Sequence, residues 1–122
     1  MDEGGSDGGR PAGEDVLLEP AVLGLPRLGE RATLVHFSSA FCQPCRATRR
    51  VLAEVGGMVE GVAHVEIDAE EHLGLVRRLG IQGTPAVLVL SAGGRVVRRA
   101  YGQPRTADVI AAVGEAAEAA ER

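Results

Sequence analysis

Short apolar runs alternate with segments of helical spacing along most of the chain. Residues 33–38 (TLVHFS) are rich in β-branched residues and apolar on both faces, which predicts a buried central strand. From residue 46 to residue 59 apolar positions recur at helical spacing and arginines occupy the other side, which predicts an amphipathic helix. The positions expected to face the core are Thr48, Val51, Leu52, Val55, Met58 and Val59.

A second strand and a second helix are predicted over the next segment. Residues 62–68 (VAHVEID) alternate between apolar and polar positions, as a half-buried strand does. Asp68 and Glu71 resemble a capping box that opens a helix, and Gly80 is placed to end that helix as a C-terminal cap. Its expected buried positions are Leu73, Val76 and Leu79.

The last part of the chain predicts a hairpin followed by a helix. Residues 85–90 (PAVLVL) and 95–101 (RVVRRAY) are expected to pair as antiparallel strands through the tight turn of residues 91–94 (SAGG). Pro104 and Thr106 introduce an alanine-rich helix. Its expected inward positions are Val109, Ile110 and Val113.

The order of these elements is β-α-β-α-β-β-α, which implies the α/β fold class with a mixed central β-sheet flanked by α-helices. Residues 1–14 are acidic and glycine-rich with little to bury, so they are predicted to be a flexible tail. Residues 15–122 are expected to form one domain. Within it, residues 16–28 are expected to add a short edge strand or a turn.

Composition and charge narrow the classes of partner. Hydrophobic residues make up 45% of the 122 residues but aromatic residues only 2%, so an aliphatic core is expected. The 13 basic residues are outnumbered by 17 acidic ones, and the net charge of -4 argues against nucleic acid as the main partner. Local clusters of arginine are interpreted as solvated faces, some of them paired with glutamate.

The sequence predicts no membrane span in this chain, because no segment reaches the ~18 apolar residues that a spanning helix needs. Its first ten residues, MDEGGSDGGR, are unlike the basic and apolar regions of a signal peptide. The protein is therefore expected to be soluble and cytoplasmic. If an anchor or signal has been removed upstream of Met1, it is expected to be extracytoplasmic instead.

The two cysteines of the chain, Cys42 and Cys45, lie between the first predicted strand and the first predicted helix. Cys42 is expected at the helix N-cap or first turn, where Pro44 is well tolerated. Unpaired backbone N–H groups and the helix dipole there favour the Cys42 thiolate, and Arg46 and Arg49 add positive potential. Cys45, one turn further in, is expected to be the poorer nucleophile, which suits a dithiol that attacks and then resolves a mixed disulfide.

The cysteine pair alone leaves three interpretations open: a redox pair, half of a metal site, or two inert core residues. A closed zinc site needs about four ligands, and none of His36, His64 and His72 has ligand spacing with the cysteines. Neither a metal nor a cofactor is therefore expected. Thr84 and Pro85 give a second signal, because Pro is tolerated at the first residue of a strand and X-Pro is the usual place for a cis peptide. Taken alone, this signal favours an ordinary loop proline.

Together these segments resemble the thioredoxin family over residues 33–119. The resemblance rests on VHFSSAFCQPC, EIDAE, LGIQGTPAVLVL, the GGRVV hairpin and the glycine after it. It implies the thioredoxin fold and a thiol–disulfide oxidoreductase that reduces protein disulfides through Cys42 and Cys45. It also implies that Pro85 is cis and packs against the dithiol and that the backbone of Thr84 pairs with extended substrate. The other residues assigned to substrate binding are Phe41, Gln43, Gly83 and Gly102.

The sequence departs from the family pattern around the cysteines. Phe41 and Ser38 replace two tryptophans, Gln43 replaces a glycine, and Arg50 replaces a helix proline. The family's buried Asp and its Lys partner fall at His36 and His64. A neutral His36 is a candidate acceptor for the Cys45 proton during resolution. The alternative is a core histidine satisfied by one backbone hydrogen bond.

The expected partners are disulfide-containing proteins together with a reductase or a membrane electron donor, and the chain is expected to be a monomer. Two alternatives remain. One is a dedicated extracytoplasmic reductant of the same superfamily. The other is a thioredoxin-like metal-handling or binding module that uses the cysteine thiolates as ligands.

Overall fold

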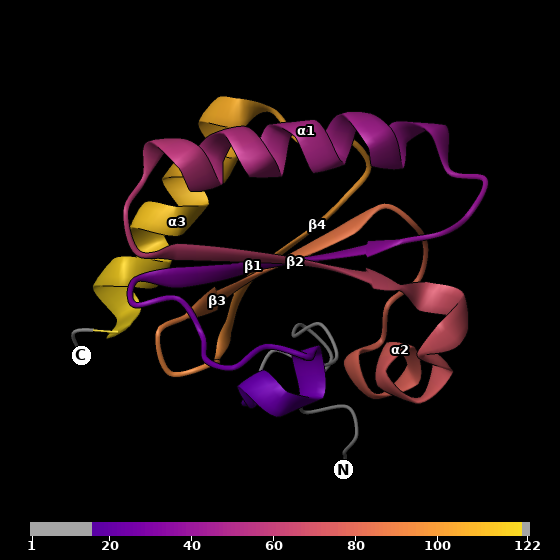
Figure 1. Ribbon diagram of the computed structural model, residues 1–122, viewed down its shortest axis with the longest axis horizontal. Coiled ribbons are helices and arrows are strands. Elements are labelled where there is room, and N and C mark those ends of the chain that lie inside the picture. The colour runs from indigo at the N-terminus through magenta and orange to yellow at the C-terminus, as the bar shows by residue number, and fades with distance from the viewer. Residues whose placement is uncertain (1–15, 121–122) are drawn as a thin grey trace, which may run out of the picture.

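The structure, a computed structural model, describes residues 16–120, so the predicted tail of residues 1–14 lies outside the described part of the chain. The described elements follow the order that the sequence predicts (Figure 1). They are the 3₁₀ helix η2 (Pro20–Leu23), β1 (Ala32–Ser38), α1 (Gln43–Met58), β2 (Val62–Asp68), the 3₁₀ helix η3 (Ala69–Glu71), α2 (Leu73–Leu79), β3 (Ala86–Ser91), β4 (Val96–Tyr101) and α3 (Thr106–Ala120). Within residues 16–120 no helix is long and apolar enough to cross a membrane.

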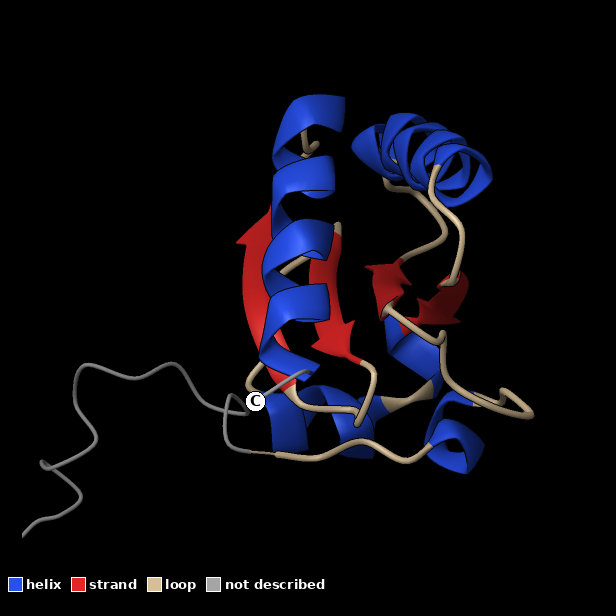
Figure 2. Cartoon of the chain, turned by 90° about the vertical axis from the view of Figure 1, so that its left-hand side faces the viewer, coloured by secondary structure: helices blue, strands red, loops and turns tan. Residues whose placement is uncertain are grey.

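The four strands form one mixed sheet in the order β2-β1-β3-β4. β1 runs parallel to β2 and antiparallel to β3, and β3 and β4 form the predicted hairpin. Every residue of β1 is buried, which confirms the prediction of a central strand. In Figures 1 and 2, α1 lies above the sheet and α2 below it, so helices cover both faces.

Each face of the sheet has its own aliphatic core. On one face, Leu34 of β1 packs with Leu52 of α1 and Val109 of α3. On the other, Val35 and Phe37 of β1 pack with residues of α2 and of the segment before β1. Neighbouring residues of a strand point to opposite faces, so the apolar stretch of β1 supplies both cores. The core is mainly aliphatic, as predicted, with Phe37 as an aromatic member.

In α1 and α3, two apolar side chains that were expected to be inward are on the surface. Met58 is 55% exposed and Ile110 is 40% exposed. A step of one residue turns a helix by about 100°. Val109 is buried, so its neighbour Ile110 turns toward solvent. Met58 is the last residue of α1, and the chain leaves the helix at Val59, whose backbone is extended and whose side chain packs against the core.

The segment after β2 also differs from the prediction. The Asp68 carboxylate accepts a hydrogen bond from the Glu70 backbone N–H at 2.9 Å, which closes a 3₁₀ turn instead of a capping box with Glu71. The helix α2 therefore begins later, and its first residue, Leu73, is 54% exposed. Gly80 ends α2 with a φ of 67°, a left-handed conformation that glycine adopts without strain, as predicted.

Before β1, the described segment is a turn and not an edge strand. Its regular element is the 3₁₀ helix η2, which buries Leu23. A single antiparallel bridge joins Leu17 to Arg95, the residue directly before β4. Leu18 also packs in the core below the sheet, so this segment closes that face, as the alternative prediction of a turn had it.

Candidate active site

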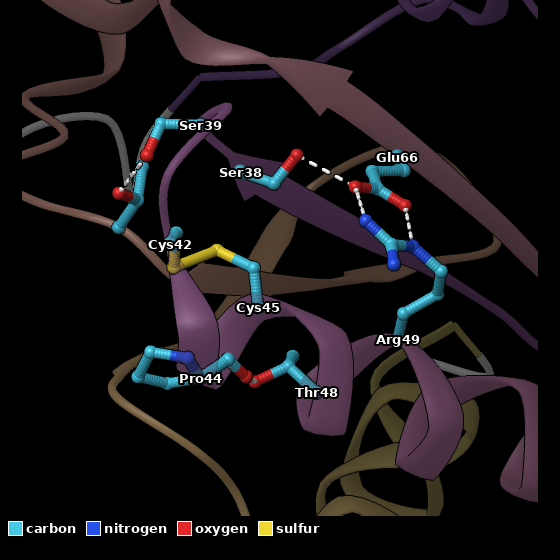
Figure 3. Close-up of a disulfide and its surroundings, with 9 residues drawn as sticks. Ser38, Ser39, Cys42, Pro44, Cys45, Thr48, Arg49 and Glu66 are labelled. Carbon is cyan, nitrogen blue, oxygen red and sulfur yellow. Dashed lines mark hydrogen bonds and ion pairs between the residues drawn. A yellow bond between two sulfur atoms is a disulfide. The ribbon is translucent and has the colours of Figure 1, made fainter.

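The two cysteines form a disulfide at the start of α1, with their Cα atoms 5.2 Å apart (Figure 3). Cys42 is the N-cap residue and Cys45 lies in the first turn, as predicted. Cys45 is 1% exposed, whereas Cys42 is half-buried. The Cys42 sulfur is therefore the one that a second molecule can approach.

Local hydrogen bonds explain why the helix begins here. The Cys45 N–H donates to the Cys42 carbonyl at 3.2 Å, which closes the first turn. Pro44 occupies one of the first two helical positions, where its missing N–H has no cost. Its carbonyl accepts a hydrogen bond from the Thr48 hydroxyl at 2.8 Å. The dithiol thus sits on a regular helix start and not on a loose loop.

The peptide bond between Thr84 and Pro85 is cis, as predicted. Two hydrogen bonds fix the surroundings of this bond. The hydroxyls of Ser39 and Thr84 are 3.0 Å apart, which joins the loop before Cys42 to the residue before Pro85. The Gly102 N–H donates to the Pro85 carbonyl at 2.9 Å, and Gly102 has a φ of 82°. The loops before α1, before β3 and after β4 therefore meet at this end of the sheet.

The remaining predicted substrate-binding residues are on the outside of this group. Phe41, directly before Cys42, is 97% exposed. Gln43 and Gly83 are also exposed. The Phe41 ring therefore lies in solvent next to Cys42 and does not contribute to the core of this chain.

Beside the disulfide lies an ion pair that the sequence did not reveal. The Glu66 carboxylate of β2 accepts hydrogen bonds from the Arg49 guanidinium at 2.5 and 2.6 Å and from the Ser38 hydroxyl at 2.6 Å (Figure 3). The hydrogen bond from Arg49, aided by that from Ser38, lowers the pKa of Glu66 to about 2. Arg49 was expected to add positive potential near the thiols, but its charge is compensated here.

His36 is completely buried on the face of the sheet that α1 covers. It lies two residues after Leu34, which packs against α1, and is in register with Glu66 of β2. Among the described residues, neither ring nitrogen of His36 has a hydrogen-bond partner. The alternative of a histidine satisfied by a backbone hydrogen bond is therefore wrong. Burial lowers the pKa of His36 to about 4, although the Glu66 carboxylate partly opposes this effect.

The other two histidines differ in their surroundings. His64 is half-buried on the same face, and burial lowers its pKa. His72 is exposed, as expected, with its Nδ1 3.0 Å from the Asp68 carbonyl oxygen. Within residues 16–120, no three His, Cys, Asp or Glu side chains are grouped so that they could hold a metal ion.

Comparison with known proteins places this site in a family. The family model described as Thioredoxin matches residues 27–115, which is well over half of the chain. Thioredoxin 2 of Chlorobaculum tepidum is 31% identical over 74 residues, which cover 60% of this chain and 67% of that protein. Thioredoxin of Alicyclobacillus acidocaldarius is 33% identical over 79 residues, which cover 63% and 74%.

Thioredoxin H2-1 of rice, Oryza sativa, is 29% identical over 72 residues, and the chain spans about half, 51%, of its length. Among solved structures, chloroplastic thioredoxin z has a TM-score of 0.64 at 29% identity, covering 74% of this chain and 80% of that one. A mutant thioredoxin from Halobacterium salinarum has a TM-score of 0.70 at 18% identity, covering 89% and 96%. The latter likeness establishes the fold alone.

Proposed function

The chain belongs to the thioredoxin family and has its mixed α/β fold, and from this premise we propose that it is a thiol–disulfide oxidoreductase that reduces protein disulfides. One observation carries the proposal. A half-buried Cys42 at a helix N-cap is disulfide-bonded to a buried Cys45, so one sulfur is accessible to a substrate and the other is reserved for the second step.

The structure corresponds to the oxidised end of the proposed cycle. In the reduced protein, the Cys42 thiolate attacks one sulfur of a substrate disulfide, and the other substrate sulfur leaves as a thiolate that takes up a proton. Cys45 then loses its proton and attacks the Cys42 sulfur, which releases the second substrate thiol. The substrate gains two electrons and the Cys42–Cys45 disulfide forms again.

The loops around the disulfide supply the substrate surface. We assign the backbone of Thr84 to pairing with an extended substrate, and Phe41, Gln43, Gly83 and Gly102 to the contacts around it. The hydrogen bond between the Ser39 and Thr84 hydroxyls and that from the Gly102 N–H to the Pro85 carbonyl support this assignment, since they hold three loops together at one end of the sheet. The exposed ring of Phe41 provides apolar area for a protein partner.

The proposed function predicts catalysis of protein-disulfide reduction. With dithiothreitol as electron donor, catalytic amounts of the protein should accelerate the reduction of a disulfide-bonded protein, measured as the appearance of free thiols. Cys42→Ser should abolish the acceleration, since Cys45 is buried and inaccessible to the substrate. Acceleration that persists in Cys42→Ser would contradict the proposal. A redox potential near the oxidising end of the superfamily, about -120 mV, would make the protein an oxidase or isomerase instead.

His36 is the proposed acceptor for the Cys45 proton. Its low pKa keeps the imidazole neutral at pH 7, so one ring nitrogen has a free lone pair. Both ring nitrogens lack partners within the described residues, and His36 lies on the sheet face covered by the helix that carries Cys45. The Glu66 carboxylate raises the pKa of His36, so it favours the imidazolium that forms when the proton arrives.

This role predicts an effect on one step only. His36→Ala should slow resolution of the mixed disulfide by about 100-fold, the size of a typical proton-transfer contribution, and leave its formation nearly unchanged. Rapid-mixing measurements with a chromogenic disulfide separate the two steps. His72→Ala, which removes an exposed histidine, is the control and should change neither rate. Equal slowing of both steps in His36→Ala, or no slowing, would exclude the role.

Turnover requires a donor that returns two electrons to the Cys42–Cys45 disulfide. We propose a partner reductase and action in the cytoplasm, whose reducing glutathione pool suits a reductant. A membrane donor would serve an extracytoplasmic reductant.

A further inference from the structure

A shallow basic hollow lies directly beside the disulfide. Gln43, Arg46, Ala47 and Arg50 of α1 line a space of about 300 Å³ on the surface. Gln43 follows Cys42 in the sequence, and Arg46 and Arg50 lie on successive turns of the same helix face. We call this surface the α1 hollow. Any substrate that reaches Cys42 comes within side-chain reach of it.

The two arginines of the α1 hollow are available to a partner. Both side chains are exposed, and within residues 16–120 no carboxylate forms an ion pair with either of them. Their neighbour Arg49 is different, because it is bound to Glu66. Glu54, one turn beyond Arg50, accepts a hydrogen bond from Thr106 of α3 at 3.3 Å. Within residues 16–120, no ion pair therefore compensates the positive charge of the α1 hollow.

A second hollow near the disulfide has the other sign of charge. Ser38, Ser39, Ala40, Arg49, Glu66 and Asp68 line this hollow, beside the loop that leads to Cys42. It holds two carboxylates against one arginine, and that arginine is already paired with Glu66. The chain as a whole is also acidic, with a net charge of -4. The α1 hollow is thus a local positive surface on one side of the reacting sulfur.

We propose that Arg46 and Arg50 select substrates with acidic residues flanking the disulfide, and seat those residues in the α1 hollow. The inference rests on the proposed function and adds the substrate class to it. Two arginines one turn apart fit one or two carboxylates, since each guanidinium presents a fork of N–H donors to a carboxylate. The asymmetry of charge around Cys42 also orients the substrate, because a carboxylate is favoured over the α1 hollow and repelled by Glu66 and Asp68.

The test compares two synthetic peptides that each contain one intramolecular disulfide. The peptides are identical except that the residues flanking the cysteines are Glu in one and Gln in the other. The second-order rate constant for their reduction by pre-reduced protein is measured from the loss of peptide disulfide. Wild-type protein should reduce the Glu peptide about tenfold faster at low ionic strength, as expected for electrostatic steering. At 1 M salt, where the screening length falls to about 3 Å, the ratio should approach 1.

The decisive readout is the Glu-to-Gln rate ratio of variants. Arg46→Gln/Arg50→Gln should lower the ratio to below about 2, and any general effect on thiol reactivity cancels because both peptides share it. Arg95→Gln is the matched control: Arg95 is exposed and lies next to the β3–β4 turn, at the far end of the sheet from Ser38, and the ratio should stay at the wild-type value. A ratio near 1 for wild-type protein, or an unchanged ratio in the double variant, would overturn the inference while leaving the proposed function intact. Reduction of neither peptide would overturn both.

Discussion

Cys45→Ser is expected to hold the protein as a covalent Cys42–substrate adduct and to lower the steady-state rate of disulfide reduction by at least about 1000-fold. Cys45 is buried directly behind Cys42 within the same helical turn, and in the oxidised protein the two sulfurs are bonded. An intramolecular thiol in this position acts at an effective concentration far above that of millimolar external thiol. Without it, the mixed disulfide can be broken only by the external reductant.

Mass spectrometry after incubation with a disulfide substrate provides the measurement. The reduced Cys45→Ser protein should accumulate one substrate adduct at Cys42, and reduced wild-type protein should accumulate almost none. The reciprocal variant Cys42→Ser is the control. It should form no adduct, since Cys45 is 1% exposed. Adducts that form equally on both variants would show that the two sulfurs do not have the distinct roles assigned to them.

The second large effect concerns pH. Burial lowers the pKa of His36 to about 4 from the ordinary 6.5, so between these values the unfolded chain binds a proton that the folded chain does not. Stability is therefore fully present above pH 6.5 and is lost as the pH falls toward 4. For this one group the linkage relation gives a loss of about 2 kcal/mol in the free energy of unfolding between pH 7 and pH 5. His64, whose pKa burial also lowers, adds to the loss.

Denaturant unfolding of the oxidised protein at pH 7 and pH 5 measures this loss. Glu66 contributes little in that interval, because its pKa is lowered to about 2 and its stabilising effect is lost only below about pH 4.5. His36→Gln should remove most of the difference between the two pH values. His72→Gln, at the exposed N-cap of α2, should preserve the difference. Equal stability of wild-type protein at both pH values would mean that His36 takes up its proton in the folded state without penalty.

Most of the fold and the centre of the site are predictable from the sequence because their signals are local. The order of elements follows from hydrophobic periodicity, and the places of Cys42 and Pro44 at a helix start follow from adjacent residues. The cis peptide before Pro85 was implied by the resemblance to the thioredoxin family. The burial of single helix positions is less predictable. Met58 and Ile110 are apolar enough for a core, but they are exposed because their neighbours Val59 and Val109 pack in the core instead.

The ion pair beside the disulfide was missed because its members are far apart in the sequence. Glu66 is 17 positions from Arg49 and 28 from Ser38. The parallel register of β1 and β2 sets His36 opposite Glu66. The Glu66 carboxylate then lies within hydrogen-bond distance of Ser38 on β1 and of Arg49 on α1. The available signal was Glu66 itself, a charged residue at a strand position that faces a helix and therefore needs a partner. Without the register, nothing in the sequence indicates which arginine meets it.

The short span of the disulfide has a consequence for how the protein can be used. Cys42 and Cys45 are three positions apart, so the bond closes one of the smallest loops a chain can form. A cross-link over so short a loop restricts the unfolded chain little, by about 2 kcal/mol against about 4.7 kcal/mol for a 100-residue loop. Because the cross-link contributes so little stability, we expect the folded scaffold to persist through repeated reduction and oxidation of the Cys42–Cys45 bond.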